Sequence, residues 1–274
     1  MKRIKMNLQL AQFDFQMNQM ARQLSITTAE AMQIVRSIGY TCLDCDFRSL
    51  TSDFCTAMKD AGLKLSLMYV FFDPAKDNSE LIQNVVEKAV QNNAVRVMPI
   101  PNSDPKPLRN KAFADMRAFQ ISLAENNIST VLEDFADPGK SFNSLAGLQN
   151  YLDNVPGLGC CFDTGNFAAD TKPLLCIADS LMPKIRHIHI KDFAINHLFA
   201  PDMLTDVRGR KLSSAPAGCG ILPVETVVKS AIKAGYRGIL AVEHANVYNE
   251  RVAMERSYSN ISRWLNELDC FSAE

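Results

Sequence analysis

The stretch GYRGILAVEH, residues 235–244, contains the repeating unit from which we predict the fold. Gly235 ends a segment with helical periodicity, and the apolar run 239–243 that follows has the length and composition of a buried strand. This run ends on a carboxylate, Glu243. The same glycine stop follows earlier helical segments at Gly39 and Gly62. Strands and helices that alternate in this way are typical of a parallel sheet with crossover helices.

Eight strand and helix pairs of this kind can be placed along the chain. We predict strands at residues 6–9, 42–45, 64–70, 95–100, 130–133, 160–163, 185–191 and 239–243. We predict helices at residues 27–38, 51–61, 78–92, 107–126, 142–153, 171–182, 223–234 and 250–268. The longest irregular stretch is expected at 192–223. An open doubly wound sheet would normally carry a glycine-rich phosphate turn, which is absent from the sequence. We therefore predict a single (β/α)8 TIM barrel domain over residues 1–274.

The composition restricts the classes of function. The chain has 274 residues, 47% of them hydrophobic, and a formal net charge of −1, so it lacks the positive field that attracts a nucleic-acid backbone. Gln9, Gln12 and Asp14 interrupt the apolar run that a signal peptide needs. The apolar run 65–72 is far shorter than the roughly 20 residues that span a bilayer. We expect a cytoplasmic protein that acts on a small molecule, with no nucleic-acid or membrane partner.

The eight cysteines are scattered along the chain rather than regularly spaced. This spacing favours reduced thiols over a disulfide framework. Cys42 and Cys45 form a CxxC pair, but within a strand a spacing of three residues directs the two side chains to opposite faces. A zinc site at this pair is therefore not expected.

Four predicted strands end in residues that an apolar barrel core would not select, namely Glu133, Asp163, His189 and Glu243. The carboxyl ends of the strands form the mouth of this fold, and consecutive strands are neighbours, so these four side chains can converge. Three carboxylates close together would repel one another. One divalent metal ion, Mn, Mg, Co or Zn, resolves that conflict. Each residue taken alone could equally be a solvated or hydrogen-bonded strand end.

Six motifs carry a resemblance to a known family. They are GYTCLD at 39–44, LED at 132–134, FDTGN at 162–166, HIHIKD at 187–192, GCG at 218–220 and GYRGILAVEH at 235–244. Nearly end to end, the chain resembles the xylose isomerase-like TIM barrel superfamily, which includes sugar isomerases and epimerases, inosose dehydratases and the AP endonuclease family 2 enzymes. The resemblance implies that Glu133, Asp163, His189 and Glu243 bind one divalent metal, and that Glu133 and Glu243 are also the catalytic acid and base.

The resemblance implies a metal-dependent isomerase or epimerase that acts on a small sugar or polyol carbonyl compound. Chelation of the substrate's carbonyl and neighbouring hydroxyl would acidify the C–H between them and stabilise an enediolate. Return of the proton to the opposite face gives epimerisation, whereas return to the neighbouring carbon gives isomerisation. The alternatives are an inosose dehydratase-type lyase, which begins with the same proton abstraction, and a non-catalytic sugar-binding barrel.

The endonuclease branch of the superfamily fits the sequence poorly. That branch holds three zinc ions with several additional histidines, whereas this chain has four histidines in all, at positions 187, 189, 197 and 244. Asn166 stands where the branch would need a histidine after its DTG motif. DNA repair is therefore not expected.

Four further residues are candidates for substrate binding. His187 lies on the same side of its strand as His189, where it could contact substrate, support the ligand or be a satisfied core histidine. Lys191 could bind a substrate hydroxyl or carboxylate, or pair with Asp192 at the rim. Two more candidates in the long loop, Arg208 and Arg210, could clamp a phosphate or carboxylate, or belong to a solvated charge run. A homodimer formed through the outer helices is a further expectation.

Overall fold

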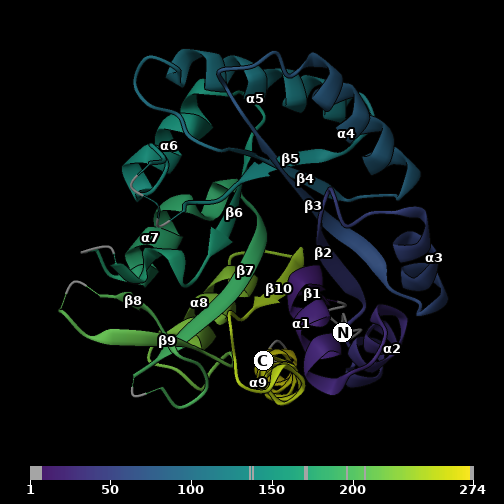
Figure 1. Cartoon of the computed structure of the whole chain (residues 1–274). Coiled ribbons are helices and arrows are strands. Elements are labelled where there is room, and N and C mark those ends of the chain that lie inside the picture. Colours follow the sequence, from purple (N-terminus) through teal and green to yellow (C-terminus); the bar gives the residue numbers. More distant parts are fainter. Residues whose placement is uncertain are drawn as a thin grey trace.

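Eight parallel strands close into a barrel in the computed structural model, which describes residues 8–135, 137, 139–169, 172–195, 197–206 and 208–271. The barrel strands are β1 (Gln9–Phe13), β2 (Cys42–Asp46), β3 (Lys64–Phe72), β4 (Arg96–Pro101), β5 (Ser129–Leu132), β6 (Gly159–Asp163), β7 (Ile185–Ala194) and β10 (Ile239–Glu243). Each strand pairs with the next, and β10 pairs with both β7 and β1, which closes the ring. The predicted TIM barrel is therefore confirmed (Figure 1).

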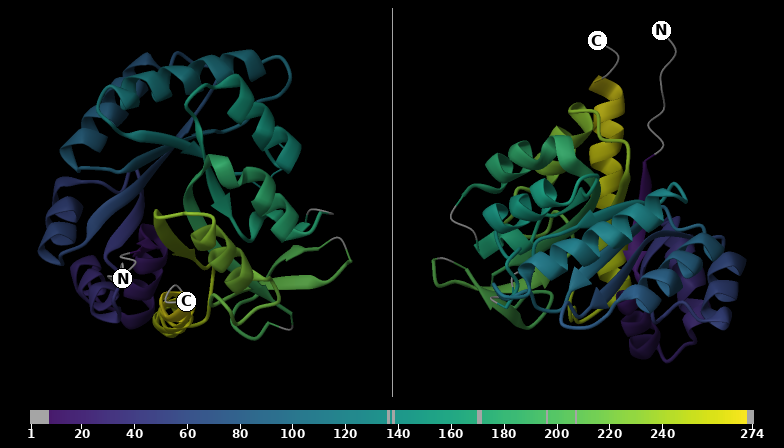
Figure 2. Two further views of the ribbon diagram at one scale, coloured as in Figure 1. Left: turned by 180° about the vertical axis from the view of Figure 1, so that it is seen from behind. Right: turned by 90° about the horizontal axis from the view of Figure 1, so that it is seen from above.

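Helices surround the barrel on its outer side (Figure 2). They are α1 (Asp14–Leu24), α2 (Thr28–Ile38), α3 (Ser52–Asp60), α4 (Ser79–Gln91), α5 (Arg109–Ala124), α6 (Leu145–Asn154), α7 (Leu174–Leu181), α8 (Val224–Lys233) and α9 (Glu250–Phe271), with 3-10 turns η1 (Asn166–Ala169) and η2 (Met182–Lys184). The long helix α9 packs against α1, α2 and α8, so the last described helix lies beside the first two.

Local sequence signals account for several helix boundaries. Thr27 and Glu30 form a capping box at the start of α2, in which each side chain satisfies the other's backbone N–H. The same helix ends at Gly39, whose φ of 123° is a conformation that side chains rarely adopt. Both boundaries agree with the prediction from the sequence.

Alternating residues of the strands form two separate hydrophobic clusters. Ala11, Ile239 and Ala241 belong to a small cluster inside the barrel, whereas Leu10 and Leu240, on the same two strands, belong to the large cluster between the barrel and its helices. This division is expected of a closed sheet, because successive side chains point to opposite faces. Because the inner face is separate from the main core, its residues can be apolar at the start of the strands and polar at their carboxyl ends.

The start of the chain differs from the prediction. The first strand occupies Gln9–Phe13 rather than residues 6–9, of which residues 6 and 7 lie outside the described part. Helix α1, which was not predicted, follows without a loop. Its N-cap residue Phe13 makes no side-chain cap, and its C-cap residue Ser25 adopts a left-handed φ of 55° where a glycine is usual. Neither end of this helix carries the usual sequence signal.

The segment predicted as irregular, 192–223, contains regular structure. The barrel strand β7 continues to Ala194, and β8 (Asp202–Thr205) and β9 (Lys211–Ala215) form an antiparallel hairpin. Strand β9 pairs with the last three residues of β7, from Asp192 to Ala194. The prediction was wrong because β8 is mostly exposed and has no apolar alternation, while β9 is held by its pairing with β7. The hairpin projects from the barrel on the left of Figure 1.

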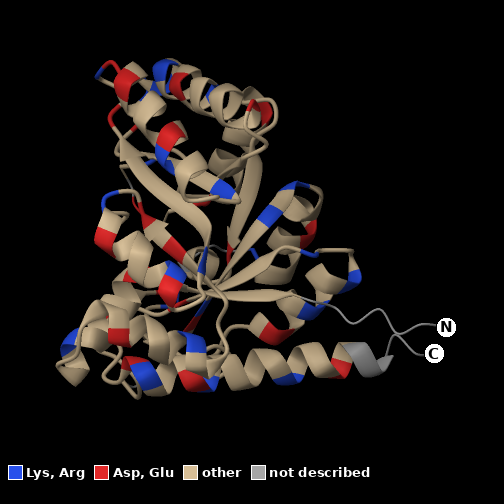
Figure 3. Cartoon of the chain, turned by 90° about the vertical axis from the view of Figure 1, so that its right-hand side faces the viewer, with Lys and Arg blue, Asp and Glu red and all other residues tan. Residues whose placement is uncertain are grey.

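Charged residues of both signs are distributed over the outer helices. In the view of Figure 3, lysine and arginine are interspersed with aspartate and glutamate on these helices, including the long helix α9. Among the described helices, none combines the length and the apolar character that a membrane span requires.

The cysteine pair of β2 is divided between the two faces of the sheet, as predicted. Cys42 lies in the cluster inside the barrel, and Cys45 lies in the cluster beneath the helices. The seven cysteines whose side chains are described carry free thiols. The CxxC spacing thus brings no second thiol to the same side of β2.

Candidate active site

Three of the four predicted metal ligands converge at the carboxyl ends of neighbouring strands. Asp163 ends β6, Glu243 ends β10, and His189 lies on β7 between them, directly opposite Asp163 in the strand register. One ligand atom from each lies within 4.8 Å of the other two. Asp163 and His189 are fully buried, while the Glu243 side chain is 16% exposed. Glu243 is therefore the member of this group that is most open to a molecule entering the barrel mouth.

The fourth predicted ligand, Glu133, contacts the same histidine. It directly follows β5, and its Oε2 lies 2.6 Å from Nδ1 of His189. The Cys161 thiol lies 4.0 Å from the same carboxylate oxygen. Burial raises the pKa of Cys161 to about 12, so this thiol stays neutral near pH 7 and is a weaker metal ligand than the carboxylate beside it.

A buried carboxylate, Asp44 on β2, lies beneath the site. Its Oδ2 is 2.7 Å from Nε2 of His187 and 3.2 Å from Nε2 of His189. Burial alone would raise the pKa of Asp44, but the two imidazoles hold it well below its usual range. His189 is thus placed between two carboxylates, with Nε2 toward Asp44 and Nδ1 toward Glu133, and its ring orientation is fixed from both sides.

Lys191 places a cation among the predicted ligands. Its Nζ lies 3.2 Å from Oδ2 of Asp163 and 2.9 Å from Oε1 of Glu243. Burial alone would lower the pKa of Lys191, but these carboxylates raise it well above its usual value. Burial also raises the pKa of Glu243 to about 7, against the opposing effect of the lysine. The site therefore contains charges of both signs.

The suggested pairing of Lys191 with Asp192 is not observed. Successive strand residues point to opposite faces, and the Asp192 carboxylate instead accepts hydrogen bonds from backbone N–H groups of Phe193, Gly218, Gly220 and Leu222. A Cβ at Gly220 would lie 2.1 Å from Oδ1 of Asp192. The GCG motif therefore forms a turn whose backbone N–H groups bind this carboxylate.

The remaining substrate-binding candidates are placed differently. His187 is fully buried, one layer below the ligands, and bonds to Asp44. Arg208 and Arg210 lie at the turn of the β8–β9 hairpin, where Nε of Arg210 pairs with Asp206 at 2.7 Å. The structure does not bring either arginine into contact with the four predicted ligands.

Two residues near the site were not given a role from the sequence. Asp44 lies on the same face of β2 as Cys42, two positions earlier, and this spacing directs it into the barrel. Asn166 accepts a hydrogen bond from Nζ of Lys191 through its Oδ1 and donates one to the backbone oxygen of Asp134. The alternation of strand residues could have revealed Asp44, whereas the loop conformation that places Asn166 has no such signal.

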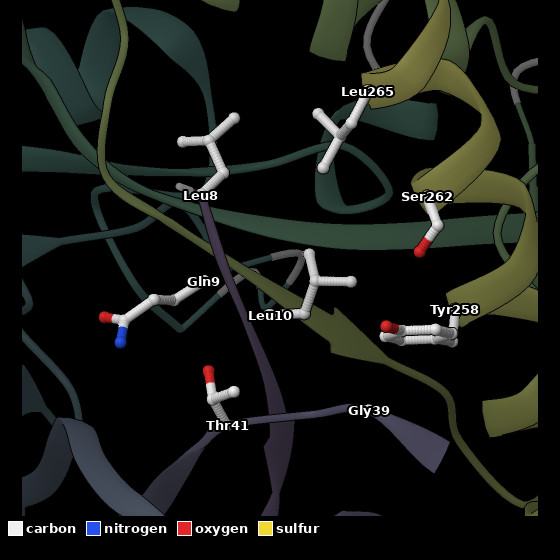
Figure 4. Close-up of a pocket in the computed structure, with 8 residues that line it drawn as sticks. All are labelled: Leu8, Gln9, Leu10, Gly39, Thr41, Tyr258, Ser262 and Leu265. Carbon is white, nitrogen blue, oxygen red and sulfur yellow. The ribbon is translucent and has the colours of Figure 1, made fainter. Parts of the chain in front are cut away.

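A separate hollow lies at the opposite end of the barrel (Figure 4). It is lined by residues at the start of β1, before β2 and on α9, namely Leu8, Gln9, Leu10, Gly39, Thr41, Tyr258, Ser262 and Leu265. None of these eight residues offers a carboxylate, imidazole, thiol or amine. This hollow therefore offers no group suited to metal or proton chemistry, unlike the carboxyl ends of the strands, where active sites of this fold lie.

Comparison with known proteins is consistent with the architecture and the motifs. The family model for xylose isomerase-like TIM barrels matches residues 32–268. The chain belongs to the xylose isomerase-like TIM barrel family. The match extends from α2 to α9 and so includes all four predicted metal ligands. Among curated proteins, no match was found.

Several solved structures share the fold of this chain at low sequence identity. A xylose isomerase-like TIM barrel protein from Mycobacterium smegmatis, in complex with magnesium, is 18% identical, with a TM-score of 0.69 over 87% of this chain and 88% of that one. The probable 3-DHS dehydratase AsbF of Bacillus anthracis is 14% identical, with a TM-score of 0.71 over 93% and 99%. A D-allulose 3-epimerase from Methylomonas sp. is 11% identical, with a TM-score of 0.70 over 94% and 98%.

Proposed function

We propose that this chain is a divalent-metal-dependent isomerase or epimerase that acts on a small sugar or polyol carbonyl compound. The observation that carries this proposal is the convergence of Asp163, His189 and Glu243, whose ligand atoms lie within 4.8 Å of one another at the barrel mouth. Two carboxylates and one imidazole are a suitable ligand set for a divalent ion, and they leave coordination positions open for substrate oxygens.

The residues present fit a metal ion. Oδ2 of Asp163 is buried and makes no hydrogen bond within the described part of the chain, its near neighbour being Nζ of Lys191. Asp163, His189 and Glu243 would hold the ion, and Glu133, which contacts His189, would complete the set. Mn, Mg, Co and Zn are the candidate ions, and a relative was crystallised with magnesium.

The two glutamates would carry the proton. A bound divalent ion would polarise the substrate carbonyl and make the neighbouring C–H more acidic. Glu133 follows β5 and Glu243 ends β10, so strands β6 and β7 separate them around the ring. A substrate between them would meet one carboxylate on each side. Glu133 would take the proton to leave an enediolate, and a protonated Glu243 would donate its own proton to the opposite face. Exchange with solvent would then deprotonate Glu133 and reprotonate Glu243.

A lyase of the inosose dehydratase type is the second candidate. We retain this candidate because the fold is similar to that of a probable 3-DHS dehydratase. The same carboxylate would abstract the proton next to the carbonyl, after which a β-hydroxyl would leave as water. Isomerisation and dehydration thus share their first step and differ in the mass of the product.

Metal analysis and a substrate panel test this proposal. We expect about one divalent ion per chain, lost in His189→Ala, because the imidazole is itself one of the proposed ligands. The metal-loaded protein would then be incubated with ketoses and inososes in D2O. Deuterium incorporation without loss of water supports isomerisation or epimerisation, whereas loss of one water supports the lyase. A protein that binds none of the four ions would contradict the proposal and favour a sugar-binding barrel.

A further inference from the structure

All four residues of the segment Asp163–Asn166 contact Lys191. The Thr164 hydroxyl accepts a hydrogen bond from the backbone N–H of Lys191 at 2.8 Å and donates one to its backbone oxygen at 2.6 Å. Gly165 leaves room for the lysine stem, since a Cβ there would lie 2.6 Å from Cγ and 2.7 Å from Cδ of Lys191. The DTGN motif therefore fixes both the backbone and the aliphatic stem of this lysine.

The ammonium group of Lys191 is held at three oxygen atoms. Asp163 and Glu243 contribute carboxylate oxygens at 3.2 and 2.9 Å, and Asn166 contributes its amide oxygen at 3.1 Å. The Lys191 side chain is only 11% exposed. A buried ammonium with three oxygen partners is well satisfied, so it has no need of a solvent or substrate partner.

The two carboxylates that hold the ammonium are also proposed metal ligands. A cation bound by Asp163 and Glu243 would lie close to the ammonium and be repelled by it, or would have to displace it from the same oxygens. Glu133, Asp163 and Glu243 carry three negative charges when ionised, and the lysine reduces their sum to minus two. Ligand charge is a principal determinant of the affinity of a carboxylate site for a divalent cation.

We propose that Lys191 is an internal competitor of the metal ion, held in place by the DTGN segment, and that it lowers the affinity of the site for divalent cations. The proposal rests on the metal site described above. Lys191 is a positioning residue in this role: it keeps Asp163 and Glu243 together and makes the bound ion exchangeable rather than permanent.

Calorimetric titration with Mn2+ tests the competition directly. Protein stripped with a chelator would be titrated as the unaltered chain, as Lys191→Met and as Lys191→Gln, which removes the charge but keeps polar atoms. We expect both variants to bind Mn2+ on the order of tenfold more tightly. Lys211→Met, which removes an exposed lysine from the hairpin, is the matched control for net charge and should leave the affinity unchanged.

Thermal unfolding gives a second measurement that does not depend on binding heat. Without metal, Lys191→Met leaves the carboxylates without their cation, so it should unfold at a lower temperature than the unaltered chain. Saturating Mn2+ should reduce this difference, because the ion replaces the missing charge. Gly165→Ala should displace the lysine stem and also tighten Mn2+ binding, but it should add nothing further when combined with Lys191→Met.

The outcomes separate this inference from the proposed function. If the unaltered chain binds Mn2+ and both Lys191 variants bind it equally or more weakly, Lys191 is not a competitor, although the metal site stands. If neither the unaltered chain nor the variants bind any of the four candidate ions, the metal site itself is wrong. Tighter binding in both Lys191 variants, with no change in Lys211→Met, supports the competition.

Discussion

Oδ2 of Asp44 lies 2.7 Å from Nε2 of His187, and neither side chain has any exposed surface. The same oxygen lies 3.2 Å from Nε2 of His189. Ser66 donates a further hydrogen bond to Asp44. A buried polar layer thus supports the predicted metal ligand from below, and its members are inaccessible to substrate.

Asp44→Asn should weaken metal binding, although Asp44 is not one of the proposed metal ligands. The amide carries no negative charge to orient His189, and loss of such a supporting carboxylate typically reduces metal affinity roughly tenfold or more. Stability should also fall by about 1–3 kcal/mol, because the bond partners of Asp44 are buried. Mn2+ titration and urea unfolding would measure both effects, with Asp179→Asn, an exposed position on α7, as the control. An unchanged Mn2+ affinity would show that Asp44 does not position His189.

Glu133→Gln and Glu243→Gln should each reduce solvent-proton exchange by roughly 100-fold or more while the fold is retained, because general acid–base catalysis requires the carboxylate. The measurement is deuterium incorporation into a substrate identified from the panel, with circular dichroism to verify folding. Glu87→Gln, an exposed position on α4, is the control. Persistence of full exchange in either site variant would remove that glutamate from the proton-transfer mechanism.

Among the seven cysteines whose side chains are described, Cys176 should react first with a thiol reagent at pH 8. It is exposed on α7, whereas Cys42, Cys45, Cys160 and Cys161 are buried. Burial raises the pKa of these four thiols, so they form less of the reactive thiolate and are also shielded from the reagent. Mass spectrometry of partially labelled protein, with Cys176→Ser for comparison, would locate the modified residue. Rapid labelling of Cys42 or Cys45 in the folded protein would contradict the described burial.

Gly220→Ala should destabilise the protein by about 1–3 kcal/mol through overpacking. Its Cβ would lie 2.1 Å from Oδ1 of Asp192 and 2.3 Å from the backbone oxygen of Phe193, so the turn would have to move. Gly209→Ala tests a glycine with no neighbouring atom within 4 Å but with a φ of 76°, and should cost about 1–2 kcal/mol for backbone conformation alone. Chemical unfolding would compare the two. No loss of stability in Gly220→Ala would mean that the turn accommodates the added methyl group.

The barrel was predictable because its signals are local. Apolar runs such as 239–243 have strand composition, and glycine stops such as Gly39 mark helix ends. Helix α1 was missed because Phe13 and Ser25, at its two ends, carry no capping signal. The β8–β9 hairpin was missed because its pairing partner, the end of β7, is supplied by tertiary structure.

The candidate site was predictable only in part. The polar strand ends identified Asp163, His189 and Glu243, because the fold brings consecutive strands together. The contacts of Lys191 were not foreseen, although the spacing of two that relates His187 to His189 also places Lys191 on the inner face. The spacing does not predict that the long side chain of Lys191 contacts Asp163 on one neighbouring strand and Glu243 on the other.

Strand β7 is shared by two sheets, with Lys191 the last residue paired to β10 and Asp192 the first paired to β9. The boundary between barrel and hairpin is therefore a single peptide bond. The hairpin is a modular addition: exchanging its distal part for a shorter or longer turn leaves every pairing of the barrel intact. For protein engineering, this edge is the natural place to graft a new recognition loop beside the barrel mouth.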